Sequence, residues 1–597
     1  MLPSQFSTLI QSLGLSSGFY KPCPSHLNQT ALQSIPQQST PVPEVQYAAQ
    51  QVHNFSSQVN PRDDQQQNFN TQYDPCYVEP YHVPAPPEYP FDPYDEAKAT
   101  IFRFRQQQSV NLGSWWEFVH ESWMTPSLFL CAGGPQVAEL DIAYGWGSQE
   151  AARSVLERHW DTFITQEDFD NLAKIGINTV RLPIGYWSLG PGFLGGTPFE
   201  PVADVYRNAW SRVLRAIGMA SQAGVGVLVD LHGAVGSQNG QPHSGISDGA
   251  TSLFTSPDNV AKTLEVLRFL MQQLSYVTNV VGIQILNEPQ YVPELENFYS
   301  TAIDVMRQVN PAAASFPLYL HNGFDMERFS RYTSSRTDFV VQDHHSYFVF
   351  TPWDASAPAQ QHTGNVGTGI SDDLAKASGQ QRRNLVVDEW SCALTPESLA
   401  ASGSDPVAAR RDFCTGQLEV YTNQTAGWSF WSYKKEGCDD DPGWCFTAAV
   451  GHVLPSTFFS YGKVDMTNSG LLRSIADVVA GMSPPSLSDI LHQRQLSDDP
   501  ESYIGLPGSF TEVHTRRVIQ GRGDTPASIK GYSDGFLTAK IFATYQMSKL
   551  GFTGQYIANS IQALGPGVIL PGCEGDYEHW FMSGLRDGER VVGTVEV

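Results

Sequence analysis

Two kinds of segment alternate along the chain from about residue 93 to residue 465. One kind is short, rich in Val, Ile and Leu, and apolar on both sides, which is typical of strands buried in a parallel sheet. The other kind, as in residues 165–176 and 259–274, has a helical pattern. We expect strands in the segments that start at Val110, Asn178, Gly224, Val280, Phe316, Asp338, Asn384 and Gly427.

Eight strand–helix units spread over about 340 residues predict an α/β fold, a (β/α)8 TIM barrel. The alternative is an open doubly wound sheet, which rarely needs eight parallel strands. The barrel should occupy residues 93–465.

The segments on either side of the barrel differ from it in composition. Residues 1–92 are rich in Gln, Pro and Ser and almost free of Lys and Arg. Such a composition buries too little apolar surface to offset the entropy of ordering, so we expect a disordered extension. Residues 466–597 should form a partly helical C-terminal extension, with helices near 535–552 and 554–565, and they contain no motif that carries chemistry.

Net charge and apolar runs exclude some classes of partner. The formal charge of −25 and the pI near 4.9 argue against nucleic acid and anionic membranes as partners. No apolar run reaches the roughly 18 to 20 residues that cross a bilayer, so we expect no stable membrane insertion. We expect a monomer.

Cysteine spacing and the N-terminus bear on location. The eight cysteines lack a zinc-like pair spacing, and in a chain of this length we expect no disulfide framework. The N-terminal stretch has no basic residue before its weak apolar run, which makes a poor signal peptide. We therefore predict a cytoplasmic protein, with a secreted or cell-wall location as the alternative.

Polar residues collect where the expected strands end. Two strands, in GIQILNEPQ and RNLVVDEWS, run directly into Glu288 and Glu389. In a TIM barrel the carboxyl ends of the strands surround the active site, so these side chains should converge. The whole set of strand-end residues is Arg181, His232, Asn287, Glu288, His345, Tyr347, Glu389 and Trp431.

Two carboxyl groups that face each other across a barrel mouth can hydrolyse a glycosidic bond. One must be protonated to donate to the leaving oxygen, and the other must be ionised near the anomeric carbon. Their surroundings decide which is which, because an apolar pocket favours the neutral acid and Arg or Tyr donors favour the carboxylate.

Longer motifs carry a family resemblance. NLGSW, TPSLF, VRLPIGYW, DLHGAVGSQNG, LNEP, DHHSYFVF, VDEWSCAL and GWSFWSYKKE follow one another between Asn111 and Pro455. In this order they resemble the fungal exo-β-1,3-glucanase branch of glycoside hydrolase family 5, a family of retaining TIM-barrel enzymes.

The resemblance implies a role for each strand-end residue. Glu288 would be the acid/base and Glu389 the nucleophile. Among the substrate-binding residues, Arg181 and Tyr347 would orient the nucleophile. The −1 sugar would contact His232 and His345, bind Asn287 through its 2-hydroxyl and lie on Trp431 as a platform. Glu121 would bind the non-reducing end, and Phe350 would be one half of an aromatic clamp on the +1 sugar.

The chain also departs from this family pattern. The first strand has QQSVNLGSW where the relatives have Arg-Gly before the Val, and about two extra residues precede Glu121. Gln241 stands where secreted exoglucanases carry the second aromatic of the clamp. This loss suggests an acceptor other than a plain β-1,3-linked chain, such as a β-1,6 linkage or a different aglycone.

We therefore expect a retaining β-glucosidase or exo-glucanase that acts on β-1,3-glucan or related β-glucosides, without cofactor or metal. The alternatives are a β-1,6-glucan or glycolipid (steryl or ceramide) glucosidase and, outside enzymology, a catalytically impaired glycan-binding protein.

GISDG (Gly245–Gly249) matches a serine-hydrolase elbow but lacks the preceding strand that an elbow needs. The adjacent residues Asp343, His344 and His345 point to opposite faces of a strand and cannot all bind one metal ion. Trp428 could equally be a core residue.

Overall fold

The computed structural model describes residues 76–81, 91–115, 124–462, 478–479, 481–486 and 525–594. From Val78 onward these residues belong to one compact unit. We expected disorder in residues 1–92, and almost all of these residues lie outside the described ranges. Glu121 also lies outside them.

Eight parallel strands close into a barrel in which each strand pairs with its neighbours in chain order. The TIM-barrel prediction is therefore confirmed, and all eight expected segments contain a strand. The strands are β1 (Gln107–Asn111), β2 (Thr179–Gly185), β3 (Gly226–Gly233), β4 (Val280–Gln284), β5 (Leu318–His321), β6 (Val340–Ser346), β7 (Leu385–Trp390) and β8 (Gly427–Phe430).

Helices cover the outside of the barrel. The two helical segments expected from sequence are α6 (Gln166–Lys174) and α8 (Pro257–Leu274). The others between β1 and the end of the barrel are α3 (Pro126–Phe129), α4 (Glu139–Gly145), α5 (Gln149–Thr162), α7 (Ala209–Gln222), α9 (Leu295–Arg307), α10 (Met326–Ser335), α11 (Pro352–Ser356), α12 (Ala359–Asn365), α13 (Ser371–Gln380), α14 (Pro396–Ala401), α15 (Pro406–Gln424) and α16 (Phe446–Ala449).

Alternation along each strand separates the core from the site. In β2, Val180 and Leu182 belong to the large apolar cluster under the helices, whereas Arg181 between them is fully buried inside the barrel. The pairing register shifts in β6–β7 between Asp343 and His345. Such an irregularity re-aims side chains, here at the strand ends that carry the expected catalytic residues.

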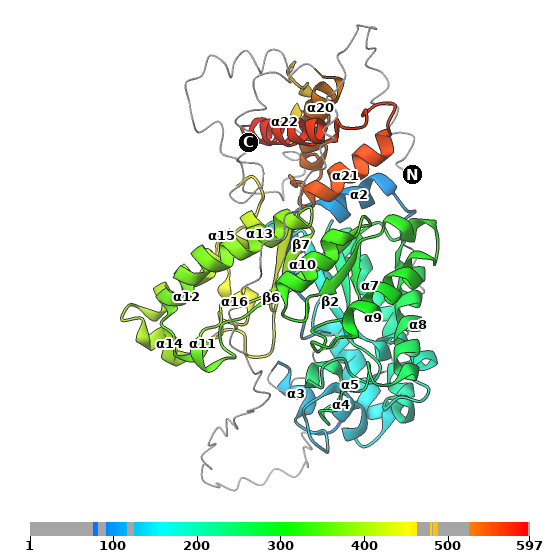
Figure 1. The fold of residues 1–597 in the computed structure, drawn as a ribbon. Helices are drawn as coiled ribbons and strands as arrows, with labels where there is room; N and C mark the ends of the chain where they lie inside the picture. Colours follow the sequence, from blue (N-terminus) through cyan, green and yellow to red (C-terminus); the bar gives the residue numbers. More distant parts are fainter. Residues whose placement is uncertain are drawn as a thin grey trace, which may run out of the picture. The chain divides into compact units, whose positions relative to one another are not determined.

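Helices from both ends of the described chain pack against the opposite, N-terminal end of the barrel. They are α2 (Glu96–Phe104), α20 (Pro526–Ala543), α21 (Thr553–Leu564) and α22 (Glu574–Gly593) (Figure 1). One apolar cluster joins Phe104 of α2, strand residues such as Val281 and Val341, and Phe581 of α22. The C-terminal extension therefore contributes to the closure of this end of the barrel.

Glycines let α20 and α22 approach closely. A Cβ atom added at Gly535 would lie 2.0 Å from the Phe581 carbonyl oxygen, and one at Gly584 would lie 2.0 Å from the Tyr532 carbonyl oxygen. Any larger residue at these positions would force the two helices apart. The same spacing of glycines occurs in both helices, at 531 and 535 and at 584 and 588.

The cysteine prediction is wrong. Cys392 is disulfide-bonded to Cys414, and Cys438 to Cys445. None of the described cysteines is free. Distance along the chain did not reveal the first pair, because Cys392 follows β7 and the fold places α15, which carries Cys414, beside it.

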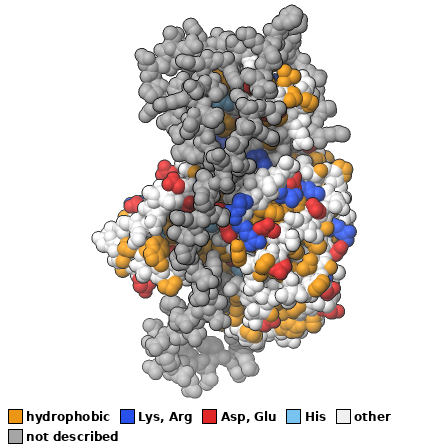
Figure 2. Space-filling view, viewed as in Figure 1, with side chains coloured by type: hydrophobic (Ala, Val, Ile, Leu, Met, Phe, Trp, Pro, Cys, Tyr) orange, Lys and Arg blue, Asp and Glu red, His pale blue; other side chains and the backbone are white. Residues whose placement is uncertain are grey.

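Charged side chains of both signs lie next to one another on the face shown in Figure 2. Ion pairs occur around α10, where Arg328 Nε lies 2.6 Å from Glu296 and Arg336 Nε lies 2.8 Å from Asp338. Within the described part of the chain, no helix combines the length and apolar character needed to span a membrane.

Candidate active site

Glu389, at the end of β7, is buried and held by two donors. Arg181 Nη1 donates to its Oε1 at 2.7 Å, and the Tyr347 hydroxyl donates to its Oε2 at 2.8 Å. Both carboxylate oxygens therefore accept a hydrogen bond, an arrangement that favours the ionised form and fixes its orientation.

Arg181 is held as firmly as the carboxylate that it contacts. The buried guanidinium donates to Gln284 Oε1 at 3.0 Å and to Asn111 Oδ1 at 2.9 Å, and its Nη2 lies 3.0 Å from Asp230. Burial alone would lower the pKa of Arg181, but Asp230, Glu389 and other carboxylates raise it above its ordinary value. Arg181 therefore stays charged.

Glu288 follows β4 in a backbone conformation that is unusual for a residue with a side chain, with φ at 39°. Strain of this kind persists where the surrounding structure imposes it, commonly in an active site. Its Oε1 lies 2.6 Å from His345 Nδ1, and its Oε2 lies 3.8 Å from His243 Nε2.

His345 lies between the two glutamates. Its Nδ1 is 2.6 Å from Glu288 Oε1 and 3.4 Å from Glu389 Oε2, so these two carboxylate oxygens are at most 6.0 Å apart. Retaining glycosidases hold their carboxyl groups about 5 to 5.5 Å apart, and inverting ones about 6.5 to 9.5 Å. The spacing here fits double displacement.

Asn287 is oriented by a chain of hydrogen bonds. Its Oδ1 accepts from Arg181 Nη2 at 2.8 Å, and its Nδ2 lies 3.0 Å from His232 Nε2. His232 Nδ1 in turn lies 2.7 Å from Asp230. Because Nδ2 carries two hydrogens, this arrangement leaves one to donate to a sugar hydroxyl.

Comparison with known proteins shows the family of the chain. The family model described as "Cellulase (glycosyl hydrolase family 5)" matches residues 147–437. A protein named "Glucan 1,3-beta-glucosidase 3" from Schizosaccharomyces pombe is 36% identical over 343 residues, which cover 56% of this chain and 71% of that protein. The chain belongs to glycoside hydrolase family 5. A second relative of this family 5 chain, named "Probable glucan 1,3-beta-glucosidase A" from Aspergillus fumigatus, is 33% identical over 389 residues, 58% of this chain and 87% of that protein. Among solved structures, rutinosidase from Aspergillus niger gives a TM-score of 0.48 at 20% identity, covering 60% of this chain and 100% of that one.

Aromatic rings surround the family 5 site. Trp431 is nearly buried and lies 6.0 Å from the His232 ring, centroid to centroid. Phe350 is 73% exposed at the rim, with its ring 5.5 Å from Tyr347 and 6.4 Å from Trp444. Trp428 lies in the core at the other end of β8, so its alternative reading as a core residue fits.

The loop after β3 places polar groups beside Glu288. Asn239 Nδ2 donates to the Glu288 carbonyl oxygen at 3.0 Å and lies 2.8 Å from His243 Nε2. Gln241, the residue that replaces an aromatic, belongs to the same loop. Ser247 of GISDG follows a 3-10 turn rather than a strand, and its hydroxyl donates to Asp141 at 3.0 Å. This placement disfavours a serine hydrolase.

Several residues of the site escaped sequence reasoning. They are Asp230, Asn239, His243, Gln284, His321 and Asp343, of which only Asp343 was considered from the sequence, and only as a metal ligand. A signal existed for two of them, because Asp230 and Asp343 each stand two positions before an expected histidine and therefore share its strand face. No pattern of this kind marks the loop residues Asn239 and His243.

Donor atoms of Glu288, His321 and His345 lie within 4.8 Å of one another, as metal ligands could. Both ring nitrogens of His345, however, already face carboxylates, Glu288 at Nδ1 and Asp343 at Nε2. His344, which points the other way, lies near Asn322, with Nδ1 3.1 Å from its Nδ2.

The pKa values of the site residues follow the same contacts. Burial and the charge of Glu288 raise the pKa of Glu389, against the opposing effects of His345, Arg181 and Tyr347. Burial also acts to raise the pKa of Glu288, but His345 and His243 outweigh it and lower that pKa. The pKa of His345 is well above its ordinary value because Asp343 and Glu389 overcome burial. The protonated form of His345 is therefore favoured between the two glutamates.

Proposed function

We propose that this family 5 hydrolase is a retaining β-glucosidase that acts on β-1,3-glucan or related β-glucosides. The observation that carries the proposal is the spacing of at most 6.0 Å between oxygens of Glu288 and Glu389, with His345 between them.

In the first step Glu389 attacks the anomeric carbon and forms a covalent glycosyl-enzyme. Glu288 gives a proton to the glycosidic oxygen as the bond to the leaving group breaks. His345 Nδ1, 2.6 Å from Glu288, supplies that proton to the acid, and its Nε2 keeps its own proton on Asp343. Desolvation by the bound sugar favours the transfer, because it raises the pKa of Glu288.

In the second step Glu288 acts as the base. It takes a proton from a water molecule that attacks the anomeric carbon and releases Glu389. Arg181 and Tyr347 stabilise the departing carboxylate through the same two bonds that orient it at the start. Trp431 offers a flat apolar surface for the C–H face of the −1 sugar.

The proposed sugar and linkage are supported by the names of the two curated relatives, which are both glucan 1,3-β-glucosidases. The polar loop with Asn239, Gln241 and His243 supports a second candidate for the acceptor side, a β-1,6 linkage or a glycolipid. Phe350 is the half of the aromatic clamp that the sequence keeps for that sugar.

A substrate panel tests the proposal. We expect purified full-length protein to release glucose from laminari-oligosaccharides faster than from gentio- or cello-oligosaccharides of equal length, with β-glucose appearing first by proton NMR. Preference for gentio-oligosaccharides would move the assignment to β-1,6 linkages. Absence of turnover on any of them, by a protein that unfolds cooperatively, would favour the glycan-binding alternative.

A further inference from the structure

The loop after β3 holds the backbone on both sides of Glu288. Gln238 Nε2 donates to the Asn287 carbonyl oxygen at 3.0 Å. Asn239 Nδ2 donates to the Glu288 carbonyl oxygen, also at 3.0 Å. The Gln290 backbone N–H in turn donates to the Gln238 carbonyl oxygen at 3.0 Å. Three hydrogen bonds to two consecutive loop residues therefore fix the segment that contains Glu288.

This segment is also the one with a strained backbone. The φ and ψ angles of a residue describe how the rigid peptide groups on its two sides are rotated about its Cα atom. Gln238 holds the peptide group before Glu288, and Asn239 holds the one after it. Both angles are therefore set from the loop, and the φ of 39° at Glu288 persists because its surroundings impose it.

Asn239 is itself oriented by the loop. Its Oδ1 accepts from the Gln241 backbone N–H at 3.0 Å, so the amide nitrogen faces Glu288, and Nδ2 also lies 2.8 Å from His243 Nε2. An amide nitrogen only donates, and Nε2 must therefore accept, which makes the His243 ring neutral. Burial lowers the pKa of His243, against the opposing charge of Glu288, and so favours this neutral form.

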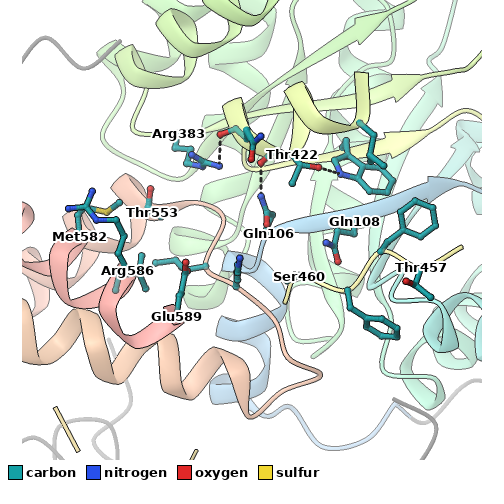
Figure 3. A pocket seen from close by; sticks show the side chains of 18 residues that line it. Gln106, Gln108, Arg383, Thr422, Thr457, Ser460, Thr553, Met582, Arg586 and Glu589 are labelled. Atoms are coloured by element: carbon teal, nitrogen blue, oxygen red, sulfur yellow. Dashed lines mark hydrogen bonds between the residues drawn. The ribbon is translucent and has the colours of Figure 1, made fainter. Parts of the chain in front are cut away.

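Bonds from side chains to backbone also occur at the other end of the barrel, around a cavity of about 500 Å³ (Figure 3). There Gln106 Nε2 donates to the Thr422 carbonyl oxygen at 2.8 Å, and Arg383 Nη2 donates to that of Asn423 at 3.2 Å. These bonds join the starts of β1 and β7 to the end of α15 and involve no residue of the active site. The bond from Asn239 differ from them in its target, because it acts on the backbone of a proposed catalytic residue.

We propose that Asn239, held by His243, is a positioning residue for the acid/base Glu288. It touches no reacting atom. By fixing the peptide group that follows Glu288 it aims the carboxyl group toward the glycosidic oxygen in the step that protonates this oxygen. The inference rests on the proposed function, since it concerns proton donation in the same reaction.

Two aryl β-glucosides separate proton donation from other effects. Phenolate is a poor leaving group that needs a proton from Glu288, whereas 2,4-dinitrophenolate leaves without one. We expect Asn239→Ala to lower kcat/KM for phenyl β-glucoside by about 10- to 100-fold and to change it less than about threefold for the dinitrophenyl compound. His243→Leu removes the acceptor of Asn239 and should shift the ratio of the two kcat/KM values in the same direction by a smaller factor. It decides the matter if Asn239→Ala does not fold.

Asn259→Ala is the matched control. Asn259 Nδ2 donates to the carbonyl oxygen of Ser252 at 3.2 Å and to its hydroxyl at 3.0 Å, and so holds the same loop at a point away from Glu288. This variant should lower the Tm and leave the ratio of the two kcat/KM values unchanged.

The positioning role is overturned if folded Asn239→Ala loses activity equally on both glucosides or keeps it on both. It is also overturned if Asn259→Ala changes the ratio as Asn239→Ala does. A folded wild type that hydrolyses neither glucoside would overturn the proposed function, and the positioning role with it.

Discussion

Tyr347 and Arg181 show how single residues set the state of Glu389, the proposed nucleophile. Each occupies one oxygen of Glu389, and each is itself anchored, Arg181 by Gln284 and Asn111 and Tyr347 by packing against Trp444. A carboxylate fixed in this way needs little reorganisation when it attacks and when it departs.

Tyr347→Phe should therefore lower kcat by roughly 10- to 100-fold, because a hydrogen bond to a charged group is lost. The free energy of unfolding should change little. Steady-state kinetics on an aryl β-glucoside measure the effect. Tyr421→Phe is the control, since its hydroxyl contacts Ser346 and Gln417 rather than Glu389 and its loss should affect stability instead of kcat. Equal activity of Tyr347→Phe and wild type would remove Tyr347 from the mechanism.

Glu139 gives a pH prediction at the same scale. It is fully buried beside Tyr206 and Trp187, and burial raises its pKa to about 8. The unfolded chain releases this proton near pH 4.5, so the stability that it contributes is complete below that pH and is lost as pH rises toward 8. Between pH 4 and pH 9 the wild type should lose stability that Glu139→Gln keeps. The free energy of unfolding of Glu139→Gln minus that of the wild type should therefore be higher at pH 9 than at pH 4, by roughly 3 to 5 kcal/mol. Urea titrations at both pH values would show this, and parallel curves would contradict it.

Sequence patterns predicted that Glu288, Glu389 and their strand-end neighbours meet, because barrel topology sends those positions to one place. They could not predict His243 or Asn239. These residues reach Glu288 through the fold of the loop after β3, where no periodicity constrains direction.

At the scale of elements, the contact between α20 and α22 depends on glycine. Gly535→Ala should destabilise the chain by roughly 1 to 3 kcal/mol, because its Cβ would overlap the Phe581 carbonyl oxygen. Gly575→Ala, on α22 with open space around it, should be neutral or stabilising by up to about 1 kcal/mol. Thermal unfolding compares the two. Similar effects of both substitutions would show that the helices do not pack as described.

The glycine content of α22 explains why this helix was not predicted from the sequence. Four of its 20 residues are Gly, which disfavours a helix on propensity, and tertiary packing against α20 overrides that preference. The strands, by contrast, were predicted because burial on both sides leaves a continuous apolar run.

At the scale of the whole molecule, the barrel and the C-terminal helices share one apolar cluster. A chain that ends at residue 462 would expose Phe104, Val281 and Val341. We expect it to aggregate or to unfold at a lower Tm, because exposed apolar surface of this kind drives association. Deletion of residues 1–75, expected from composition to be disordered, should leave the Tm unchanged. Light scattering and thermal unfolding test both, and a stable, monomeric chain of 462 residues would contradict the shared core.

The disulfides bear on location. The cytoplasmic prediction rested in part on an absent disulfide framework, whereas Cys392–Cys414 and Cys438–Cys445 are bonded. Because bonds of this kind persist in oxidising compartments, we propose the secreted or cell-wall alternative in place of the cytoplasmic prediction. Counting cysteines along the sequence could not decide this point, because pairing depends on which elements meet in space.

The central claim is that Glu389 is the nucleophile and Glu288 the acid/base of a retaining glucosidase. The most direct measurement is azide rescue of Glu389→Ala and Glu288→Ala on an activated aryl β-glucoside, with the product configuration determined by NMR. We predict α-glucosyl azide from Glu389→Ala, where azide replaces the nucleophile, and β-glucosyl azide from Glu288→Ala, where azide attacks the glycosyl-enzyme. No rescue, or the same anomer from both variants, would contradict the assignment.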